Sequence, residues 1–238
     1  MISRIFTLVQ AVVFIAVMAI AGSVAWFFAW PDIAALKKEN PAKTSFMKYR
    51  EEEWQSAGRK VKIDWRWVPA SRISPYLRTA VIIAEDDKFW NHAGFDFEAM
   101  KKAAEKDIKA KKFKAGGSTI SQQLVKNLYL SPSKNPTRKL KEAILTYRME
   151  NTLSKKRILE IYLNVIEWGD GVFGAEAAAR RYFGKSAADL DAGEAARLAV
   201  VLPNPRKLNP LRQDGYVKKR ADTIYEIMVK RGYVAEEE

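Results

Sequence analysis

The sequence contains no cysteine and only one histidine, His92. The lack of cysteine excludes disulfides, thiol nucleophiles and cysteine-ligated metals. The single histidine excludes most histidine-rich metal sites, and it limits any Ser-His-Asp arrangement to one candidate base. These absences permit an oxidising compartment but do not indicate one.

Charge is absent between Ile5 and Trp30, a run of 26 residues. As a helix this run is about 39 Å long, and it exceeds the roughly 20 residues that cross a bilayer. Aromatic residues from Trp26 to Trp30 are typical of a membrane interface. Ala19 to Ala21 resembles a signal-peptide cleavage site. The apolar run continues well past that point, which favours a membrane anchor over a cleaved leader.

The 238 residues suffice for one full-sized domain and a small appendage. Proline, lysine and glutamate follow the apolar run and indicate a linker with one short helix. From Ser74 onward helix signals dominate, which predicts a mostly α fold. The expected organisation is a short cytoplasmic tail at residues 1–4, a transmembrane helix at 5–30, a linker or membrane-proximal segment at 31–67 and a folded domain at 68–238.

Local signals predict several helix boundaries. Ser74 and Pro75 have the pattern of an N-cap followed by proline at the first helical position. In the helix that follows Pro136, Leu140, Ile144 and Tyr147 have core-facing spacing. Further expected boundaries are a cap at Ser118 or Thr119, an opening at Asn135-Pro136, a cap at Ser154, a glycine stop at Gly184 and a capping box of Asp191 and Glu194.

A formal net charge of +13 indicates an anionic partner. Nucleic acid, lipid headgroups and a phosphorylated substrate all fit this charge, and a membrane anchor favours the last two. The basic stretch Lys101–Lys114 could contact anionic headgroups. A basic surface that is merely solvated remains the alternative.

The stretch AEDDKFWNH, from Ala84 to His92, places three acids after the apolar run TAVII. Glu85 stands where a buried helix meets irregular chain. A carboxylate at such a junction is partly desolvated, which raises its pKa toward that of a useful general base. A solvated helix end is the alternative. His92 either orients a carboxylate or caps the turn.

The stretch GGSTISQQLVKN carries a second polar group of residues. Ser118, Gln122 and Lys126 are four residues apart and so share a helical face, with Thr119 and Gln123 in the adjacent row. Hydroxyl, amide and lysine groups behind a Gly-Gly turn suit hydrogen bonds to a sugar or a phosphate. An N-capped helix with an ordinary solvated face remains open.

A third polar group surrounds Glu142 with the basic residues Lys134, Arg138, Lys139 and Lys141. Arg138 and Glu142 are four residues apart and could form only a surface ion pair worth about 0.3–0.5 kcal/mol. The functional interpretation is a cationic site for a diphosphate leaving group, with one acid inside it.

These motifs stand in an order that resembles a known family, the peptidoglycan glycosyltransferases of glycosyltransferase family 51. The resemblance covers about Val68 to Pro210, and several long motifs in order are more specific than one short pattern. Because the chain stops soon after, it resembles the monofunctional biosynthetic enzyme. The motifs are EDDKFWNHAG (85–94), GGSTISQQLVKN (116–127), RKLKE (138–142) and KKRILEIYLN (155–164).

The resemblance implies a lysozyme-like, mostly helical domain on the outer, periplasmic face of the bacterial inner membrane, behind a single transmembrane helix. It implies polymerisation of lipid II into β-1,4-linked glycan strands, with inversion and release of undecaprenyl diphosphate. The implied partners are lipid II, the growing lipid-linked strand and membrane lipids, with other cell-wall synthesis proteins as further candidates. Nucleic acid is not expected.

The resemblance also implies roles for individual residues. Glu85 matches the general base, and Glu142 the second acid, beside the diphosphate and a divalent cation such as Mg²⁺ or Mn²⁺. No cofactor is expected to be obligatory. Glu160, Tyr162 and Asn164 in the fourth motif are expected to be structural. The remaining candidates for substrate binding are Asp86, Phe89, His92, Ser118, Thr119, Gln122, Gln123, Lys126, Asn127, Lys134, Arg138 and Lys139.

Three other functions compete with this one. A glycan-cleaving enzyme of lysozyme-like architecture would also need carboxylates, but it would not need a basic site for a diphosphate. A catalytically silent membrane-anchored scaffold would not need both Glu85 and Glu142. Nucleic-acid binding is disfavoured, because the basic residues are not interleaved with base-stacking aromatics in a recognisable module.

Overall fold

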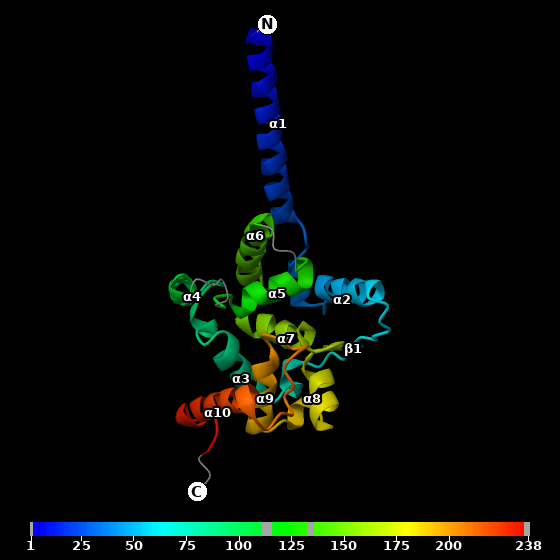
Figure 1. Cartoon of the computed structure of the whole chain (residues 1–238), viewed down its shortest axis with the longest axis vertical. Helices are drawn as coiled ribbons and strands as arrows, with labels where there is room; N and C mark the ends of the chain where they lie inside the picture. Colours follow the sequence, from blue (N-terminus) through cyan, green and yellow to red (C-terminus); the bar gives the residue numbers. More distant parts are fainter. Residues whose placement is uncertain (1, 111–115, 133–135, 236–238) are drawn as a thin grey trace.

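The structure is a computed structural model that describes residues 2–110, 116–132 and 136–235 (Figure 1). Lys134 and part of the basic stretch Lys101–Lys114 therefore lie outside the described residues. The described chain is mostly helical. Its α-helices are α1 (Ile2–Ala29), α2 (Ser45–Ser56), α3 (Pro75–Glu85), α4 (Phe97–Ala110), α5 (Ile120–Tyr129), α6 (Pro136–Thr152), α7 (Lys155–Val165), α8 (Ala175–Phe183), α9 (Ala192–Val201) and α10 (Gly215–Lys230).

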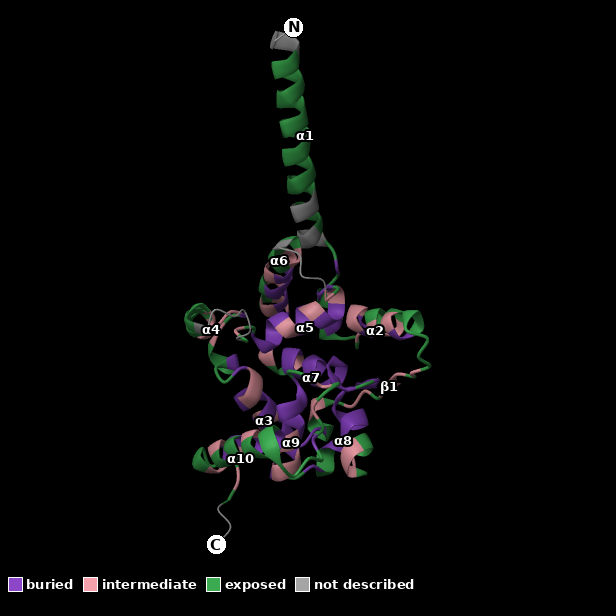
Figure 2. Ribbon diagram, viewed as in Figure 1, coloured by how far each residue is buried: buried purple, intermediate pink, exposed green. Residues whose placement is uncertain are grey.

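The first helix, α1, projects alone from the rest of the molecule (Figure 1). Its segment Ile5–Gly22 is long and apolar enough to cross a membrane, and none of it is buried. Figure 2 shows its exposed residues along most of its length. So much exposed apolar surface is unfavourable in water. By length and composition, α1 therefore agrees with the expected anchor.

The core is built around α7, in which seven of eleven residues are buried. A helix that is buried on most sides needs neighbours on most sides. α5 packs against α7, α6 and α2, while α3 packs against α9 and α10. This arrangement brings the end of α3 within hydrogen-bond distance of α5, which matters for the site described below.

The helix caps that the sequence predicts are confirmed. Ser74 accepts a hydrogen bond from the N–H of Tyr76, and Ser154 accepts one from the N–H of Arg157. Of the two candidates before α5, Thr119 is the cap. Gly184 ends α8 in the left-handed conformation, and Asp191 and Glu194 form the expected capping box. These signals are local, so neighbouring residues suffice to satisfy the backbone groups.

The segment expected to be a linker, residues 31–67, is packed against the domain. Its helix α2 contacts α5, and Met47 and Trp54 form a small core with Phe173. Its strand β1 (Asp64–Trp65) pairs in parallel with β3 (Val172–Phe173), which pairs antiparallel with β2 (Glu167–Gly169). This segment is rich in charged residues. Met47 and Trp54 are buried against Phe173, which lies more than a hundred residues further along the chain, and a local pattern does not indicate such a contact.

The predicted core-facing stripe of α6 is wrong. Leu140 and Tyr147 are 56% and 60% exposed, and Ile144 is only partly buried. The buried side of α6 instead includes the apolar residues Leu145 and Met149 and the polar residues Glu142 and Thr146. Burial of a charged residue requires ion-pair partners. Those partners are present one turn away, and an apolar pattern alone cannot indicate them.

Candidate active site

Glu85 is the last residue of α3 and is partly buried. Its Oε2 accepts a hydrogen bond of 2.7 Å from Nε2 of Gln123 on α5. Burial raises the pKa of the Glu85 carboxyl above its usual value, and this effect exceeds the opposing effects of the Gln123 hydrogen bond and of nearby Lys126 and Arg220. A carboxylate whose pKa is raised in this way is suited to accept a proton.

The next acid, Asp86, is buried and fully engaged. Its Oδ1 lies 2.8 Å from Nε2 of His92, and its Oδ2 accepts a hydrogen bond of 2.9 Å from the N–H of Ile120. Nδ1 of His92 accepts from the N–H of Gly94, so the ring proton belongs on Nε2 and points at Asp86. Asp86 therefore ties the end of α3 to the start of α5, which determines where Glu85 lies.

Phe89 packs beneath the residues of the first motif. It is fully buried and makes edge contacts with Trp90 and His92. The ammonium of Lys155 lies 4.5 Å from the centre of its ring, a cation–π contact that links α7 to the first motif. Phe89 and His92 therefore shape the surroundings of the two acids.

The N-terminus of α5 uses two of the predicted substrate-binding residues as a cap. Thr119 accepts from the N–H of Gln122, and Oε1 of Gln122 accepts from the N–H of Thr119 at 3.0 Å. The Thr119 hydroxyl also donates to the carbonyl of Gly94. Both residues are 2% exposed. These hydrogen bonds indicate that Thr119 and Gln122 position the N-terminus of α5. Ser118, just before the helix, is exposed.

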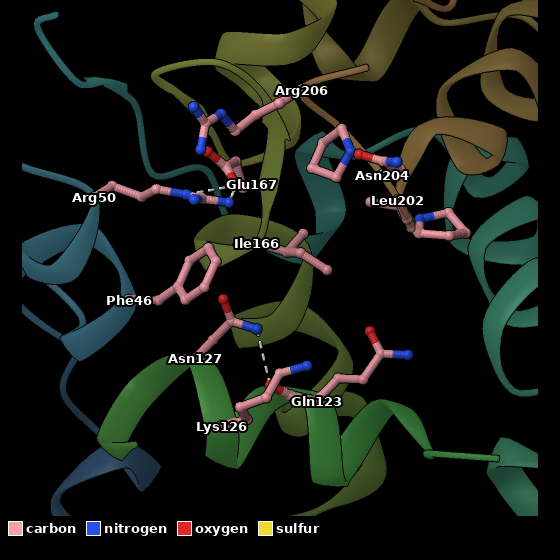
Figure 3. Close-up of a pocket in the computed structure, with 12 residues that line it drawn as sticks. Phe46, Arg50, Gln123, Lys126, Asn127, Ile166, Glu167, Leu202, Asn204 and Arg206 are labelled. Carbon is pink, nitrogen blue, oxygen red and sulfur yellow. Dashed lines mark hydrogen bonds and ion pairs between the residues drawn. The ribbon is translucent and has the colours of Figure 1, made fainter. Parts of the chain in front are cut away.

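The polar face of α5 differs from the predicted row of Ser118, Gln122 and Lys126. Gln123, Lys126 and Asn127 line a cavity of about 230 Å³, here called the Lys126 cavity (Figure 3). The opposite side carries Arg50, Glu167, Asn204 and Arg206. The predicted row is wrong because Gln122 belongs to the capping box, so its side chain is buried and does not lie on the polar face of α5.

A second cavity of about 290 Å³, here called the Glu85 cavity, lies beside the first motif. Glu85, Ser118 and Lys102 are among its lining residues. Gln123 lines the Lys126 cavity and donates to Glu85, which lines the Glu85 cavity. This hydrogen bond therefore connects the linings of the two cavities.

Lys126 interacts electrostatically with both acids of the predicted site. Burial lowers the pKa of its ammonium, opposed by Glu142 and, more weakly, by Glu85. Arg138 and Lys139 also act on it. A partly desolvated cation interacts strongly with an anion that replaces its lost water. Asn127 donates to the carbonyl of Gln123 at 2.9 Å, so its amide is held within α5.

Glu142 is 3% exposed and is held between two cations. Its Oε2 accepts from Arg138 at 2.7 Å, and its Oε1 accepts from Lys139. Lys139 is half-exposed and Arg138 is partly buried. The predicted cluster of the third motif is thus present, except for Lys134, which lies outside the described residues.

Around Glu142 the described residues show ion pairs rather than a cluster of metal ligands. Both of its oxygens are engaged by cations, and the described residues contain no group of three or more His, Cys, Asp or Glu that could hold a metal ion. A divalent cation needs several oxygen ligands. Binding of Mg²⁺ or Mn²⁺ at Glu142 therefore stays a prediction, and no chemical step is assigned to it.

Several residues that line the Lys126 cavity lie outside the sequence motifs and were not predicted as site residues. Phe46 and Arg50 come from the expected linker, and Arg206 follows α9. Arg50 forms an ion pair of 2.7 Å with buried Glu167, whose pKa burial raises. Arg206 in turn pairs with Glu53 of α2 at 2.9 Å. These ion pairs join residues that are far apart in the sequence, and spacing along the chain does not indicate them.

Taken together, the site offers one proton acceptor and a group of cations on a rigid helical frame. Glu85 is the proton acceptor. Lys126 supplies positive charge near it, and Arg138 and Lys139, which both pair with Glu142, act on Lys126. Such an arrangement can remove a proton from a hydroxyl and stabilise an anionic leaving group.

The sequence is similar to those of known proteins over most of its length. The transglycosylase family matches residues 52–229. A biosynthetic peptidoglycan transglycosylase of Aromatoleum aromaticum is 57% identical over 168 residues, covering 71% of this chain and 73% of that protein. One from Nitrosospira multiformis is 47% identical over 221 residues, covering 93% and 92%. One from Dechloromonas aromatica is 56% identical over 167 residues, covering 70% and 72%. The chain belongs to the transglycosylase family.

Proposed function

We propose that the chain polymerises lipid II into β-1,4-linked glycan strands for cell-wall synthesis, with Glu85 as the general base. The observation that carries this proposal is the position of Glu85, a partly desolvated carboxylate that Gln123 orients and that nearby, partly buried Lys126 influences. The relatives named above are peptidoglycan transglycosylases, which supports the same reaction class.

In the proposed reaction the 4-hydroxyl of the acceptor sugar enters beside Glu85. Its oxygen forms a bond to the anomeric carbon of the lipid-linked strand as its proton passes to Glu85. The bond from that carbon to the α-linked diphosphate breaks, and the electron pair leaves with undecaprenyl diphosphate. Attack opposite the leaving group gives a β bond, so the anomeric centre is inverted.

The cations act on the departing diphosphate. Lys126, Arg138 and Lys139 are the candidates for this role, because they lie close enough to influence one another and Glu142. Positive groups placed in advance stabilise the charge that develops as the bond breaks. Glu142 keeps Arg138 and Lys139 in position by pairing with both. Ser118, exposed in the Glu85 cavity, is a candidate for a sugar contact.

The test compares full-length protein in detergent with its Glu85→Gln variant, using labelled lipid II. We expect polymer from the parent and a loss of at least about a hundredfold in the variant, the usual effect of removing a general base. Glu51→Gln is the matched control, because Glu51 is a partly exposed acid of α2 that pairs with Lys43. Equal polymer from parent and Glu85→Gln would remove Glu85 from this role. Reducing ends released from finished glycan would indicate the glycan-cleaving alternative.

We also propose that the domain lies on the outer, periplasmic side of the inner membrane, anchored by α1. The exposed apolar segment Ile5–Gly22 supports an anchor, and the substrate is lipid-linked. Protease treatment of spheroplasts should degrade the domain, whereas intact inverted inner-membrane vesicles should protect it. The reverse pattern would contradict this orientation. Contacts with other cell-wall synthesis proteins remain a prediction.

A further inference from the structure

Gln123 connects Glu85 to a buried tyrosine of α7. Its Nε2 donates to Oε2 of Glu85 at 2.7 Å, and its Oε1 accepts from the hydroxyl of Tyr162 at 2.9 Å. Tyr162 is fully buried. The three side chains come from α3, α5 and α7 and form a continuous line of hydrogen bonds.

The direction of these hydrogen bonds is determined by chemistry. An ionised carboxylate can only accept, so the amide nitrogen of Gln123 must face Glu85. The amide oxygen then faces Tyr162, whose hydroxyl must donate. A Gln123 amide turned by 180° would place its oxygen against the carboxylate, and the two acceptors would repel each other.

The surroundings of Tyr162 favour the protonated form of its hydroxyl. Burial raises the pKa of Tyr162 well above its usual value, and the nearby Glu85 and Asp86 raise it further. Tyr162 is therefore a permanent donor, whereas a solvent molecule in its place could donate or accept.

We propose that Tyr162 is a positioning residue for catalysis: its hydroxyl fixes the orientation of the Gln123 amide, which in turn holds Glu85 as an ionised, correctly aimed base. This inference rests on the proposed role of Glu85. It assigns to the fourth motif a function in the reaction, where the sequence indicated only a structural one.

The proposal has a defined consequence for pH dependence. The charged groups that act on Glu85 are Lys126 from α5, Arg220 from α10 and the adjacent Asp86. None of these is altered by replacing Tyr162 with phenylalanine. Without the hydroxyl, the amide of Gln123 is free to turn, and the ionised form of Glu85 loses part of its hydrogen bond. The pKa of Glu85 then rises, and the acidic limb of the rate profile moves to higher pH.

The experiment is a double-mutant cycle in full-length protein, with initial rates of lipid II polymerisation measured across pH. The variants are Tyr162→Phe, Gln123→Ala and the two combined. Tyr182→Phe is the matched control, because it also removes a tyrosine hydroxyl hydrogen bond, to the carbonyl of Trp168, in another part of the domain.

We expect Tyr162→Phe to lower kcat about tenfold, roughly the effect of one hydrogen bond, with KM changed less than twofold and the acidic limb displaced upward. In the Gln123→Ala background the same change should alter kcat less than twofold, because its effect passes through Gln123. Tyr182→Phe should leave the position of the acidic limb unchanged.

Three results would overturn the inference: a wild-type pH profile and kcat for Tyr162→Phe, a full additional loss in the Gln123→Ala background, or a lower melting temperature as the only effect. Failure of the proposed function is distinguishable from these, since Glu85→Gln would then retain the activity of the parent.

Discussion

Asp86 and His92 are joined by a hydrogen bond of 2.8 Å whose direction the backbone of Gly94 determines. Because Gly94 donates to one ring nitrogen, the other carries the proton and donates to the buried carboxylate. The same carboxylate accepts from the first N–H of α5. One neutral imidazole thus helps to hold together the two helices that carry Glu85 and Gln123.

Replacing His92 by alanine should therefore affect both stability and catalysis. Buried Asp86 would lose one of its partners, and leaving a buried group unsatisfied costs about 1–3 kcal/mol. We expect the free energy of unfolding, measured by urea titration, to fall by that amount and kcat to fall with it. An Asp222→Asn change, which alters an exposed ion pair with Lys218, should have little effect. Unchanged stability for His92→Ala would contradict the role assigned to this hydrogen bond.

Glu85→Gln should remove activity while increasing stability at neutral pH. Burial raises the pKa of Glu85 in the folded protein, so the folded state binds this proton more tightly than the unfolded state. Stability from this group therefore falls as pH rises from the ordinary carboxyl pKa through the raised one. Glutamine does not ionise, so the variant does not lose stability in this way as pH rises. Urea titrations at several pH values should show the difference between parent and variant growing as pH rises, and a difference of opposite sign would refute the argument.

Activity of the parent should fall on the acidic side because Glu85 must be ionised to accept a proton. The midpoint of this fall is expected above the ordinary glutamate pKa, in the direction in which burial moves it. Initial rates of polymerisation across pH measure the midpoint. A midpoint below the ordinary value would show that Glu85 is not desolvated in the working enzyme.

Lys126→Met should lower kcat about a hundredfold to a thousandfold, the usual effect of removing one group that stabilises developing negative charge. Folding should be unharmed. Burial lowers the pKa of Lys126, which means that its charge is a cost to the folded state at neutral pH. Lys156→Met, at an exposed position on α7, is the control. A Lys126→Met protein with normal kcat would exclude a diphosphate contact, whatever its stability.

Gly94→Ala should be far more harmful than Gly58→Ala. Both glycines have positive φ, 91° at Gly94 and 67° at Gly58, which costs an alanine about 1–2 kcal/mol. At Gly94 a Cβ would also lie 2.8 Å from side-chain carbons of Thr146 and Glu150, whereas at Gly58 nothing lies within 4 Å. We expect thermal unfolding to show a clearly larger loss at Gly94. Equal losses would mean that the packing around Gly94 gives way easily.

Local chemistry explains which parts of the fold were predictable. Caps such as Thr119 and the Asp191–Glu194 box depend on residues three apart, so the sequence displays them directly. Glu85 at the end of an apolar helix was likewise visible, and its predicted desolvation agrees with the raised pKa. Its role as a base remains a prediction.

The parts that could not be predicted depend on contacts between distant residues. The Gln123 amide meets Glu85 across 38 positions and Tyr162 across 39. Nothing in the neighbourhood of Tyr162 distinguishes it from a core tyrosine. Likewise, the buried side of α6 was missed because Glu142 is stabilised there by its cations and not by apolar character.

The junction between α1 and the domain has a consequence for how substrate is found. Arg148 of α6 donates to the carbonyls of Trp30 and Pro31, so the chain is tied to the domain directly after α1 ends. With α1 in a bilayer, the domain cannot move far from the lipid surface. Encounters with a lipid-linked sugar then occur by diffusion in two dimensions, at a local concentration set by the tether rather than by the volume of the cell.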